Sequence, residues 1–269
     1  MTKQAILVAG AGGRMGRAVT AEILKTPGVA LAGGFERADS EYVGADLGNL
    51  AGLDALGLYV EASPAQSLKR ASALIDFTAP AASVENARAA AAAGVAHILG
   101  TTGLAREQEA EIAALAKKIP IVKSGNMSLG VNLLAALVEE AARRLSDDYD
   151  IEILDAHHRD KVDAPSGTAL MLGRAAAAGR GVDLDAKAVR VRDGEIGLRR
   201  AGDIGFAVIR GGGIVGEHEV RFAGSQEVIT LAHAAIDRGL FAKGAVAAAR
   251  WAAGKPPGLY SMRDVLGLG

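Results

Sequence analysis

The sequence predicts an α/β protein whose second half forms a separate α+β domain with a mixed open sheet. Strand and helix patterns alternate through residues 5–123, which is typical of a parallel sheet covered by helices. Beyond residue 200 the pattern changes to strands with a period of two. The 269 residues also exceed the usual size of a single domain. We therefore expect two domains.

The composition excludes several classes of protein. Apolar residues make up 50% of the chain, and its net charge of −1 leaves no basic surface for nucleic acid. The absence of cysteine excludes a disulfide framework and thiolate chemistry. Residues 1–9 lack the features of a signal peptide, and no apolar run is long enough to span a membrane. We expect a cytoplasmic protein with no membrane or nucleic-acid partner.

A glycine-rich turn follows the first predicted strand, residues 5–9, and leads into a helix with Val19, Ile23 and Leu24 on one face. The spacing is G-x-x-G-x-x-G with an extra glycine, not the more usual G-x-G-x-x-G, because methionine stands at position 15. Glycines at such a turn let the backbone approach a pyrophosphate at the helix N-terminus, so this segment predicts a Rossmann-type dinucleotide-binding domain. Its residues are Gly10, Ala11, Gly12, Gly13, Arg14, Met15 and Gly16.

The second strand, residues 29–35, ends at Glu36 and Arg37. Glu36 lies about twenty residues beyond Gly16, where a dinucleotide fold places the carboxylate that binds the adenosine ribose. Arg37 and Arg14 are placed to neutralise a 2′-phosphate, so the pair indicates use of both NADH and NADPH. The alternative is an ordinary charged strand end.

Three further strands and two helices complete the first domain. After a surface excursion over residues 40–72, we expect strands at 73–78, 95–99 and 119–123 and helices at 83–93 and 107–118, with Pro80 before the first helix. In an open parallel sheet, ligands bind outside the carboxyl ends of the strands. Each end alone resembles a plain loop, but together they outline a crevice. The residues at these ends are Phe77, Thr78, Gly100, Thr101, Thr102, Ser124, Gly125, Asn126 and Met127.

The second half combines helices with strands. We expect a helix over 131–145, with Leu134, Leu137, Val138, Ala141 and Leu145 at helical spacing, then a strand over 150–156 and a helix over 168–178 closed by Gly179. Strands follow at 188–192, 205–210, 217–222 and 226–233, and a helix at 241–251. Few helices remain to cover the second face of this sheet, so we expect it to be an oligomer interface.

The loop after residue 156 carries the most chemically active side chains. His157 and His158 are adjacent, and Lys161 follows. Imidazole moves protons near neutral pH, and a lysine holds a carboxylate or donates a proton. Gly167 and Thr168 open the next helix, whose first N–H groups favour an anion. The alternatives are a solvated basic loop and, for Ser166, a simple helix cap.

The other histidines point to no further site. His97, His218 and His233 lie in or beside predicted strands, and we interpret them as packing or surface residues. No ligand spacing such as H-E-x-x-H occurs, so we expect no metal site. No tyrosine has a lysine four positions on, which argues against a short-chain dehydrogenase.

Long motifs distributed over essentially the whole chain resemble the 4-hydroxy-tetrahydrodipicolinate reductase family, also called dihydrodipicolinate reductases, of diaminopimelate and lysine biosynthesis. They are VAGAGGRMG at 8–16, DFT at 76–78, GTTG at 100–103, NMSLGVN at 126–132, AHHRDKVDAPSGTA at 156–169 and VGEHEV at 215–220. One departure is Ser124-Gly125-Asn126-Met127, where the best-known members have two alanines and a final phenylalanine. From it we expect a change in cofactor preference without loss of activity.

The resemblance implies a role for each motif. The loop from Gly10 to Met15 binds the pyrophosphate, Glu36 and Arg37 contact the adenosine end, and Gly100–Thr102 and Ser124–Met127 line the nicotinamide. His157 matches a proton donor or acceptor and Lys161 a second proton donor, and we leave open which of them delivers the proton. His158, Gly167 and Thr168 match contacts to the substrate carboxylates.

The resemblance also implies that the chain returns to its first domain. It suggests a dinucleotide-binding domain of residues 1–127 and 238–269, a substrate-binding and oligomerisation domain of residues 128–237, and a homotetramer. The alternatives are another two-domain dehydrogenase, such as a homoserine dehydrogenase, and a catalytically silent nucleotide-sensing module. Neither explains the His-His-Arg-Asp-Lys loop.

Overall fold

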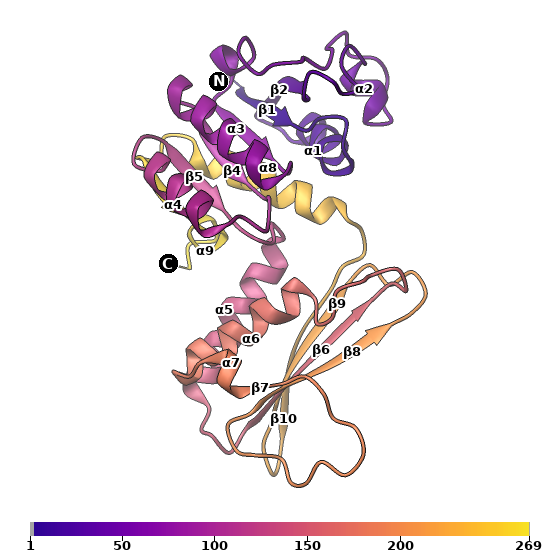
Figure 1. Ribbon diagram of the computed structural model, residues 1–269, viewed down its shortest axis with the longest axis vertical. Coiled ribbons are helices and arrows are strands. Elements are labelled where there is room, and N and C mark those ends of the chain that lie inside the picture. The colour runs from indigo at the N-terminus through magenta and orange to yellow at the C-terminus, as the bar shows by residue number, and fades with distance from the viewer. Residues whose placement is uncertain (1–2, 269) are drawn as a thin grey trace. The chain divides into compact units, whose positions relative to one another are not determined.

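The computed structural model describes residues 3–268. The chain forms two compact units, with boundaries after Leu129 and after Arg238 (Figure 1). Unit 1 contains the described residues up to Leu129 and those from Gly239 onward, and unit 2 is Gly130–Arg238. Each unit has its own sheet, and the two sheets differ in topology.

The sheet of unit 1 has six strands in the order β11-β5-β4-β3-β1-β2, and all of its pairings are parallel. The chain runs from β1 outward to β2 and then to β3 on the other side of β1. Such a switch point is where ligands bind in open α/β sheets. The strands are β1 (Gln4–Ala9), β2 (Val29–Phe35), β3 (Ala73–Asp76), β4 (Ala96–Leu99), β5 (Pro120–Lys123) and β11 (Gly258–Tyr260).

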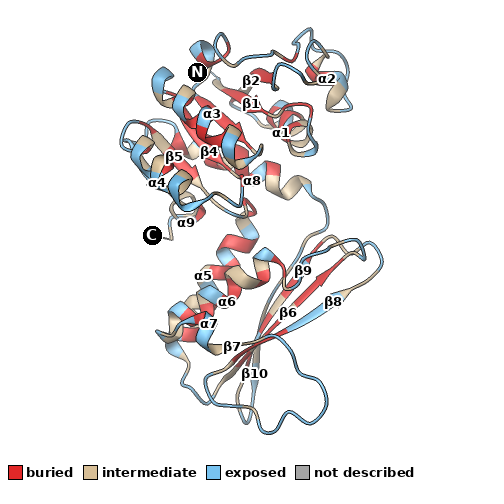
Figure 2. Ribbon diagram, in the orientation of Figure 1, coloured by how far each residue is buried: buried red, intermediate tan, exposed pale blue. Residues whose placement is uncertain are grey.

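Helices cover both faces of this sheet, so its central strands β3 and β4 are buried along their whole length (Figure 2). Ile6 and Ile75 face a core shared with α1 and α8, while Leu7 and Leu74 face a core shared with α3 and α4. The elements are α1 (Arg14–Lys25), α2 (Leu47–Leu50), the 3-10 turn η1 (Leu68–Arg70), α3 (Pro80–Ala93), α4 (Arg106–Leu115), α8 (Gly239–Ala252) and α9 (Met262–Val265).

Unit 2 has a five-stranded mixed sheet in the order β10-β9-β6-β8-β7. β9 is antiparallel to both of its neighbours, whereas β8 is parallel to β6 and β7. One face packs on α5 and α6 through residues such as Ile153, Val220 and Phe222. The elements are α5 (Leu129–Arg144), β6 (Asp150–His157), α6 (Gly167–Arg180), α7 (Leu184–Lys187), β7 (Ala188–Val189), β8 (Ile204–Arg210), β9 (Glu217–Ala223) and β10 (Val228–Ala234).

These two sheets confirm the predicted fold class, but some details of the prediction are wrong. Pro80 is the first residue of α3, where its missing N–H costs nothing. Gly179 lies inside α6, which ends at Arg180 and is followed by Gly181 in the left-handed conformation. A Cβ on Gly179 would lie 2.3 Å from the Glu139 carbonyl oxygen of α5, so this glycine permits close helix packing.

Two further differences concern patterns of burial. Leu137 of α5 was placed on the apolar face and is 47% exposed. Strand β8 does not alternate: Ile204 to Phe206 are buried and Ala207 to Ile209 are exposed, because the first half alone lies beneath helices α6 and α7. The strand predicted at 188–192 is limited to β7.

Candidate active site

The turn after β1 has the backbone geometry that a phosphate-binding turn requires. Gly10 has a φ of +65°, which favours glycine, and a Cβ on Gly16 would lie 2.1 Å from the Gly10 carbonyl oxygen. Helix α1 therefore starts tightly against the turn. Its N-cap, Gly13, makes no side-chain cap hydrogen bond, and the first turn of α1 has no acidic residue. The positive end of this helix suits an anionic phosphate.

Glu36 lies beside this turn, as its sequence position predicted. It is half-buried at the end of β2, and its Oε1 accepts a hydrogen bond of 3.0 Å from the Gly12 N–H. Arg37 is exposed and pairs with Asp39 at 3.1 Å. Tyr42 was not identified from the sequence, yet a Cβ on Gly12 would lie 2.2 Å from its ring. The ring packs directly on the glycine turn and lies 5.0 Å from the Arg17 guanidinium.

The other strand-end residues of unit 1 lie along one edge of the sheet. Asp76 is in register with Leu99, and Leu99 with Lys123, so the segments that follow β3, β4 and β5 emerge together. A Cβ on Gly10 would lie 2.9 Å from Thr78, which places the glycine turn at this edge too. The structure thus brings together Gly10, Phe77, Thr78, Gly100, Thr101, Thr102, Ser124, Gly125, Asn126 and Met127.

A buried polar network underlies this edge. The Asp76 Oδ1 accepts hydrogen bonds from the Thr78 N–H at 2.8 Å and the Thr78 hydroxyl at 2.7 Å. Its Oδ2 accepts one of 3.0 Å from Asn86 and lies 3.2 Å from the His97 Nε2. Burial alone would raise the pKa of Asp76, but the hydrogen bond and charge of His97, with the other donors, lower it to about 2. The network holds the strand end that carries Thr78.

The catalytic candidates of unit 2 are grouped around the end of β6. His157 is the last residue of that strand and not a loop residue, so Asp155 points to the same face. The His157 Nδ1 lies 2.8 Å from the Asp155 Oδ1, but the approach is too bent to form a hydrogen bond in the structure. The ring of His218, which was interpreted as a packing or surface residue, lies edge-to-face on that of His157 with centroids 5.1 Å apart.

Asp155 is the centre of this cluster. Its Oδ2 accepts a hydrogen bond of 2.7 Å from the Ser166 N–H and one of 3.1 Å from Arg210 Nη2. The His218 Nε2 lies 3.4 Å from its Oδ1. Burial would raise the pKa of Asp155, but hydrogen bonds from His218, the Ser166 N–H and Arg210 hold it well below its usual range. Asp155 is therefore a carboxylate.

His157 is neutral in this environment. Burial lowers its pKa to about 4, and the positive charges of Lys161 and Arg210 and the neighbouring His218 act in the same direction. The Asp155 carboxylate opposes this shift and does not overcome it. A neutral imidazole near pH 7 accepts protons more readily than it donates them.

The remaining predicted residues lie close by in unit 2. Lys161 Nζ lies 2.7 Å from the Asp163 carboxylate, and His158 Nε2 lies 3.3 Å from Arg238. Gly167 and Thr168 are the first residues of α6. Ser166 caps that helix by accepting a hydrogen bond of 3.1 Å from the Ala169 N–H, so the capping interpretation is confirmed.

Sequence reasoning missed three members of the cluster: Asp155, Arg210 and His218. The period-two pattern of VGEHEV places His218 on the buried face, and Asp155 precedes His157 by two residues on a strand, so both signals were available. Arg210 lies beside His157 because β6 pairs with β8. No pattern in the local sequence predicts that pairing.

Asp155, His157 and His218 also place three potential metal-binding atoms within 4.8 Å of one another. The spacing argument against metal considered only neighbours in sequence and could not detect this group. Arg210 already balances the charge of Asp155 at 3.1 Å, which favours a hydrogen-bonded network over a cation site. The expected absence of a metal stays a prediction.

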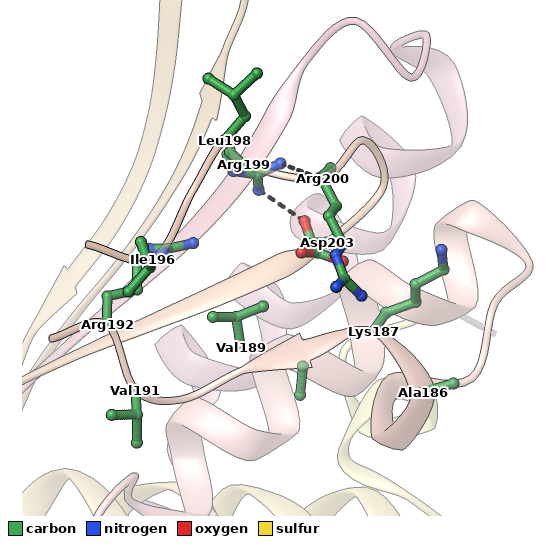
Figure 3. A pocket seen from close by; sticks show the side chains of 11 residues that line it. Ala186, Lys187, Val189, Val191, Arg192, Ile196, Leu198, Arg199, Arg200 and Asp203 are labelled. Carbon is green, nitrogen blue, oxygen red and sulfur yellow. Dashed lines mark hydrogen bonds between the residues drawn. The ribbon is translucent and has the colours of Figure 1, made fainter. Parts of the chain in front are cut away.

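A separate cavity of about 330 Å³ in unit 2 carries no predicted site residue among its lining (Figure 3). It lies where β8 begins, with Lys187, Arg192, Arg199 and Asp203 on its wall. Arg210 stands at the other end of β8, roughly 20 Å away along the strand. This cavity is therefore separate from the cluster around His157.

A parallel sheet with a glycine turn, joined to a second unit with its own mixed sheet, is the architecture of a pyridine-nucleotide-dependent oxidoreductase. Two family models match nearly the whole chain: Dihydrodipicolinate reductase, N-terminus, over residues 4–127, and Dihydrodipicolinate reductase, C-terminus, over residues 130–266. The chain belongs to the dihydrodipicolinate reductase family. It is a reductase of a small molecule, and the predictions of family, fold class and enzymatic function are confirmed.

Relatives and solved structures agree with this assignment. The chain is 56% identical to 4-hydroxy-tetrahydrodipicolinate reductase 1 of Mesorhizobium japonicum and 57% identical to the 4-hydroxy-tetrahydrodipicolinate reductase of Parvibaculum lavamentivorans, each over 98% of this chain and 97% of the relative. The fold is similar to that of a dipicolinate-bound dihydrodipicolinate reductase from Paenisporosarcina sp. TG-14, with a TM-score of 0.79, 20% identity, and coverage of 98% and 99% of the two chains. Among residues 3–268, no helix is long and apolar enough to cross a membrane.

Proposed function

We propose that the protein reduces 4-hydroxy-tetrahydrodipicolinate with NADPH or NADH, with loss of water, to tetrahydrodipicolinate in diaminopimelate and lysine biosynthesis. The observation that supports this best is the position of His157, which lies beside the Asp155 carboxylate and near Lys161 in the unit that also carries the start of α6. The substrate is a dicarboxylate, and the site offers a lysine ammonium and the positive N-terminal end of α6 as its counter-charges.

Unit 1 is proposed to bind the cofactor and unit 2 the substrate. The glycine turn and the N-terminus of α1 fit a pyrophosphate because no side chain fills the space beside Gly13 and the first turn of the helix has no acidic residue. When bound, the cofactor supplies the hydride. The proposed cofactor residues are Gly10, Ala11, Gly12, Gly13, Arg14, Met15, Glu36, Arg37, Gly100, Thr101, Thr102, Ser124, Gly125, Asn126 and Met127.

His157 and Lys161 are the proposed catalytic residues. Loss of water requires a base that takes a ring proton and an acid that protonates the departing hydroxyl, and neutral His157 suits both tasks because it can return to the hydroxyl the proton that it takes from the ring. The carbon beside the one that receives hydride then takes a proton, and the Lys161 ammonium is a donor with protons to give. His158, Gly167 and Thr168 are proposed to bind the substrate carboxylates, since the helix N-terminus favours negative charge.

Glu36 and Arg37 are proposed to allow both cofactors. A carboxylate beside the turn accepts hydrogen bonds from the ribose hydroxyls of NADH, whereas a 2′-phosphate would be approached by exposed Arg14 and by exposed Arg37, which pairs with Asp39 in the structure. Glu36→Ala should therefore raise the KM for NADH more than that for NADPH. Arg37→Ala should do the reverse, and equal effects on both cofactors would contradict these roles.

A homotetramer in the cytoplasm is the proposed state of the protein. The face of the unit 2 sheet that α5 and α6 leave uncovered has apolar residues, and Ile209 and Val228 are 51% and 57% exposed. Another copy of the chain would bury this face, as the symmetric interfaces of homo-oligomers do. Light scattering should give four copies, and a monomer at micromolar concentration would contradict the proposal. The cytoplasm supplies the pyridine nucleotide that the reaction needs.

The reaction is tested by coupling the protein to a synthase that makes its substrate from pyruvate and aspartate semialdehyde. The loss of nicotinamide absorbance should depend on the synthase and should be inhibited by dipicolinate, with either NADPH or NADH. Binding of cofactor without such turnover would contradict the proposed function, and homoserine would be the next substrate to test.

A further inference from the structure

We propose that Asp155 and His218 are positioning residues that hold His157 as the neutral tautomer with its proton on Nδ1 and its lone pair on Nε2. The inference deepens the proposed function and rests on it, because His157 is the group proposed to act on the substrate. Neither Asp155 nor His218 needs to touch the substrate in this role.

The Asp155 carboxylate is fixed before it meets either histidine. It is fully buried, and its Oδ2 is occupied by the Ser166 N–H at 2.7 Å and by Arg210 at 3.1 Å. The Ser166 N–H belongs to the cap of α6 and Arg210 to the end of β8, so two separate elements fix this oxygen. The other oxygen, Oδ1, is left facing the histidines.

Both histidines direct a ring nitrogen at Oδ1. The His157 Nδ1 lies 2.8 Å from it and the His218 Nε2 lies 3.4 Å from it. A carboxylate accepts hydrogen bonds and donates none, so the nitrogens that face it carry protons. A neutral His157 has a single ring proton, which is then on Nδ1. The bent approach is typical of catalytic hydrogen bonds that tighten when substrate binds.

The opposite side of the His157 ring lies against the backbone of Gly216. A Cβ at Gly216 would lie 3.0 Å from the His157 Nε2, which is closer than side chains normally pack. Glycine at this position leaves room beside the lone pair. Nε2 is the nitrogen through which His157 can reach another molecule, since Nδ1 is directed at buried Asp155.

His218 completes the arrangement from the neighbouring strand. The β6/β9 register places it directly across from Asp155, so both side chains point to the same face. Its Nε2 lies 3.2 Å from the Ser166 hydroxyl, and its ring packs edge-to-face on His157 at 5.1 Å. A buried ring with these contacts limits rotation of both Asp155 and His157. The charged and titratable groups around His157 are thus Asp155, Lys161, Arg210 and His218.

The tautomer of His157 is the decisive measurement. Long-range ¹H–¹⁵N NMR correlations on the histidine-labelled full chain, without substrate, distinguish a proton on Nδ1 from one on Nε2. We expect the Nδ1–H form in the wild type. In Asp155→Asn we expect a substantial Nε2–H population and a kcat lower by about 10²–10⁴-fold, with NADPH affinity within about twofold.

Variants of His218 separate positioning from packing. His218→Phe keeps a ring and removes the N–H, so kcat should fall by about tenfold or more. His218→Gln restores an N–H near Asp155 and should recover most of that loss. The matched control is His233→Gln, on the residue paired with His218 across β10 and β9, which should leave the tautomer and kcat unchanged. Thermal unfolding of each variant identifies loss of fold.

Several outcomes would overturn the inference. An Nε2–H form in the wild type would do so without any variant, and so would unchanged turnover in a folded Asp155→Asn protein. Equal losses in His218→Phe and His218→Gln would show a packing role only. Failure of the proposed function is a different result, since the wild type would then show no synthase-dependent oxidation of NADPH whatever its tautomer.

Discussion

Each unit of this protein contains a buried aspartate–histidine pair, and the two pairs differ in access to solvent. Asp76 and His97 in unit 1 lie 3.2 Å apart with side chains that are 0% exposed. Asp155 and His157 in unit 2 lie 2.8 Å apart, and His157 retains 11% exposure. Both side chains are sealed in unit 1, whereas in unit 2 the aspartate is buried and the histidine reaches the surface.

The residues that surround the two pairs also differ, chiefly in their charge. Asp76 is held by Thr78, Asn86 and His97, which are uncharged or titratable partners inside a parallel sheet. Asp155 is held by the charged Arg210 and by a helix cap, with Lys161 nearby. A sealed pair fixes the backbone, whereas an accessible pair with an adjacent ammonium is equipped for proton transfer. The role of an aspartate–histidine pair therefore depends on its access to solvent and on the charged groups beside it.

The largest expected effect is on turnover. His157→Gln should lower kcat by about 10²–10⁴-fold, because general acid–base catalysis contributes that much. NADPH binding and Tm should change little, and Lys161→Ala should behave in the same way. The measurements are steady-state kinetics, cofactor titration and thermal unfolding. Near-wild-type turnover in either variant would remove that residue from the catalytic mechanism.

The next largest effect is on stability. Asp76→Ala should lower the free energy of unfolding by about 3–5 kcal/mol, because it leaves buried His97 and Asn86 without their partner. The matched control is Arg88→Ala, which breaks the exposed pair with Glu111 and should cost about 0–1 kcal/mol. Denaturant unfolding of both variants checks this. Similar losses in the two variants would contradict the role of the sealed network.

The two pairs should also lose stability in different pH ranges. The pKa of His157 is lowered from 6.5, its usual value, to about 4 in the folded protein. As the pH falls, the unfolded chain therefore binds this proton before the folded protein does, and the free energy of unfolding decreases from pH 6.5 to pH 4. Asp76 has its pKa lowered from 3.8 to about 2, so its contribution is lost between those values. His157→Gln should remove part of the upper slope and Asp76→Asn part of the lower one. Unfolding free energies across pH 2–8 test both.

Much of the fold could be predicted because its signals are local. Glycines mark the turn after β1, and the apolar strands of unit 1 are short and continuous. What local signals could not give is close packing between elements: Gly179 looks like a helix end and is a contact between α5 and α6. Strand β11 has three residues and pairs with β5, a partner far away in the sequence.

The site was predicted in part for the same reason. His157, Lys161 and the start of α6 lie in one stretch, so their residue types alone indicated proton chemistry and anion binding. His97 was expected to be a packing or surface residue, and its ion pair depends on the pairing of β3 with β4. Arg210 reaches Asp155 only through the pairing of β6 with β8. Charged residues that meet across a sheet can be any distance apart in the sequence, so no sequence spacing reveals their contact.

The smallest expected effect is that of metal removal. Dialysis against EDTA should leave kcat and Tm unchanged, because Arg210 already neutralises Asp155 in the group formed with His157 and His218. Metal analysis of the purified protein provides the control. A loss of activity that zinc restores would show that this group binds a cation.

The most direct test of the comparison measures kcat and Tm on His157→Gln and His97→Ala in parallel. We expect His157→Gln to lose turnover by about a hundredfold or more at an unchanged Tm. We expect His97→Ala to lower Tm by roughly 10 °C and to keep most of its kcat at saturating NADPH. The reverse pattern, or loss of turnover to the same extent in both folded variants, would contradict the division of roles between the two pairs.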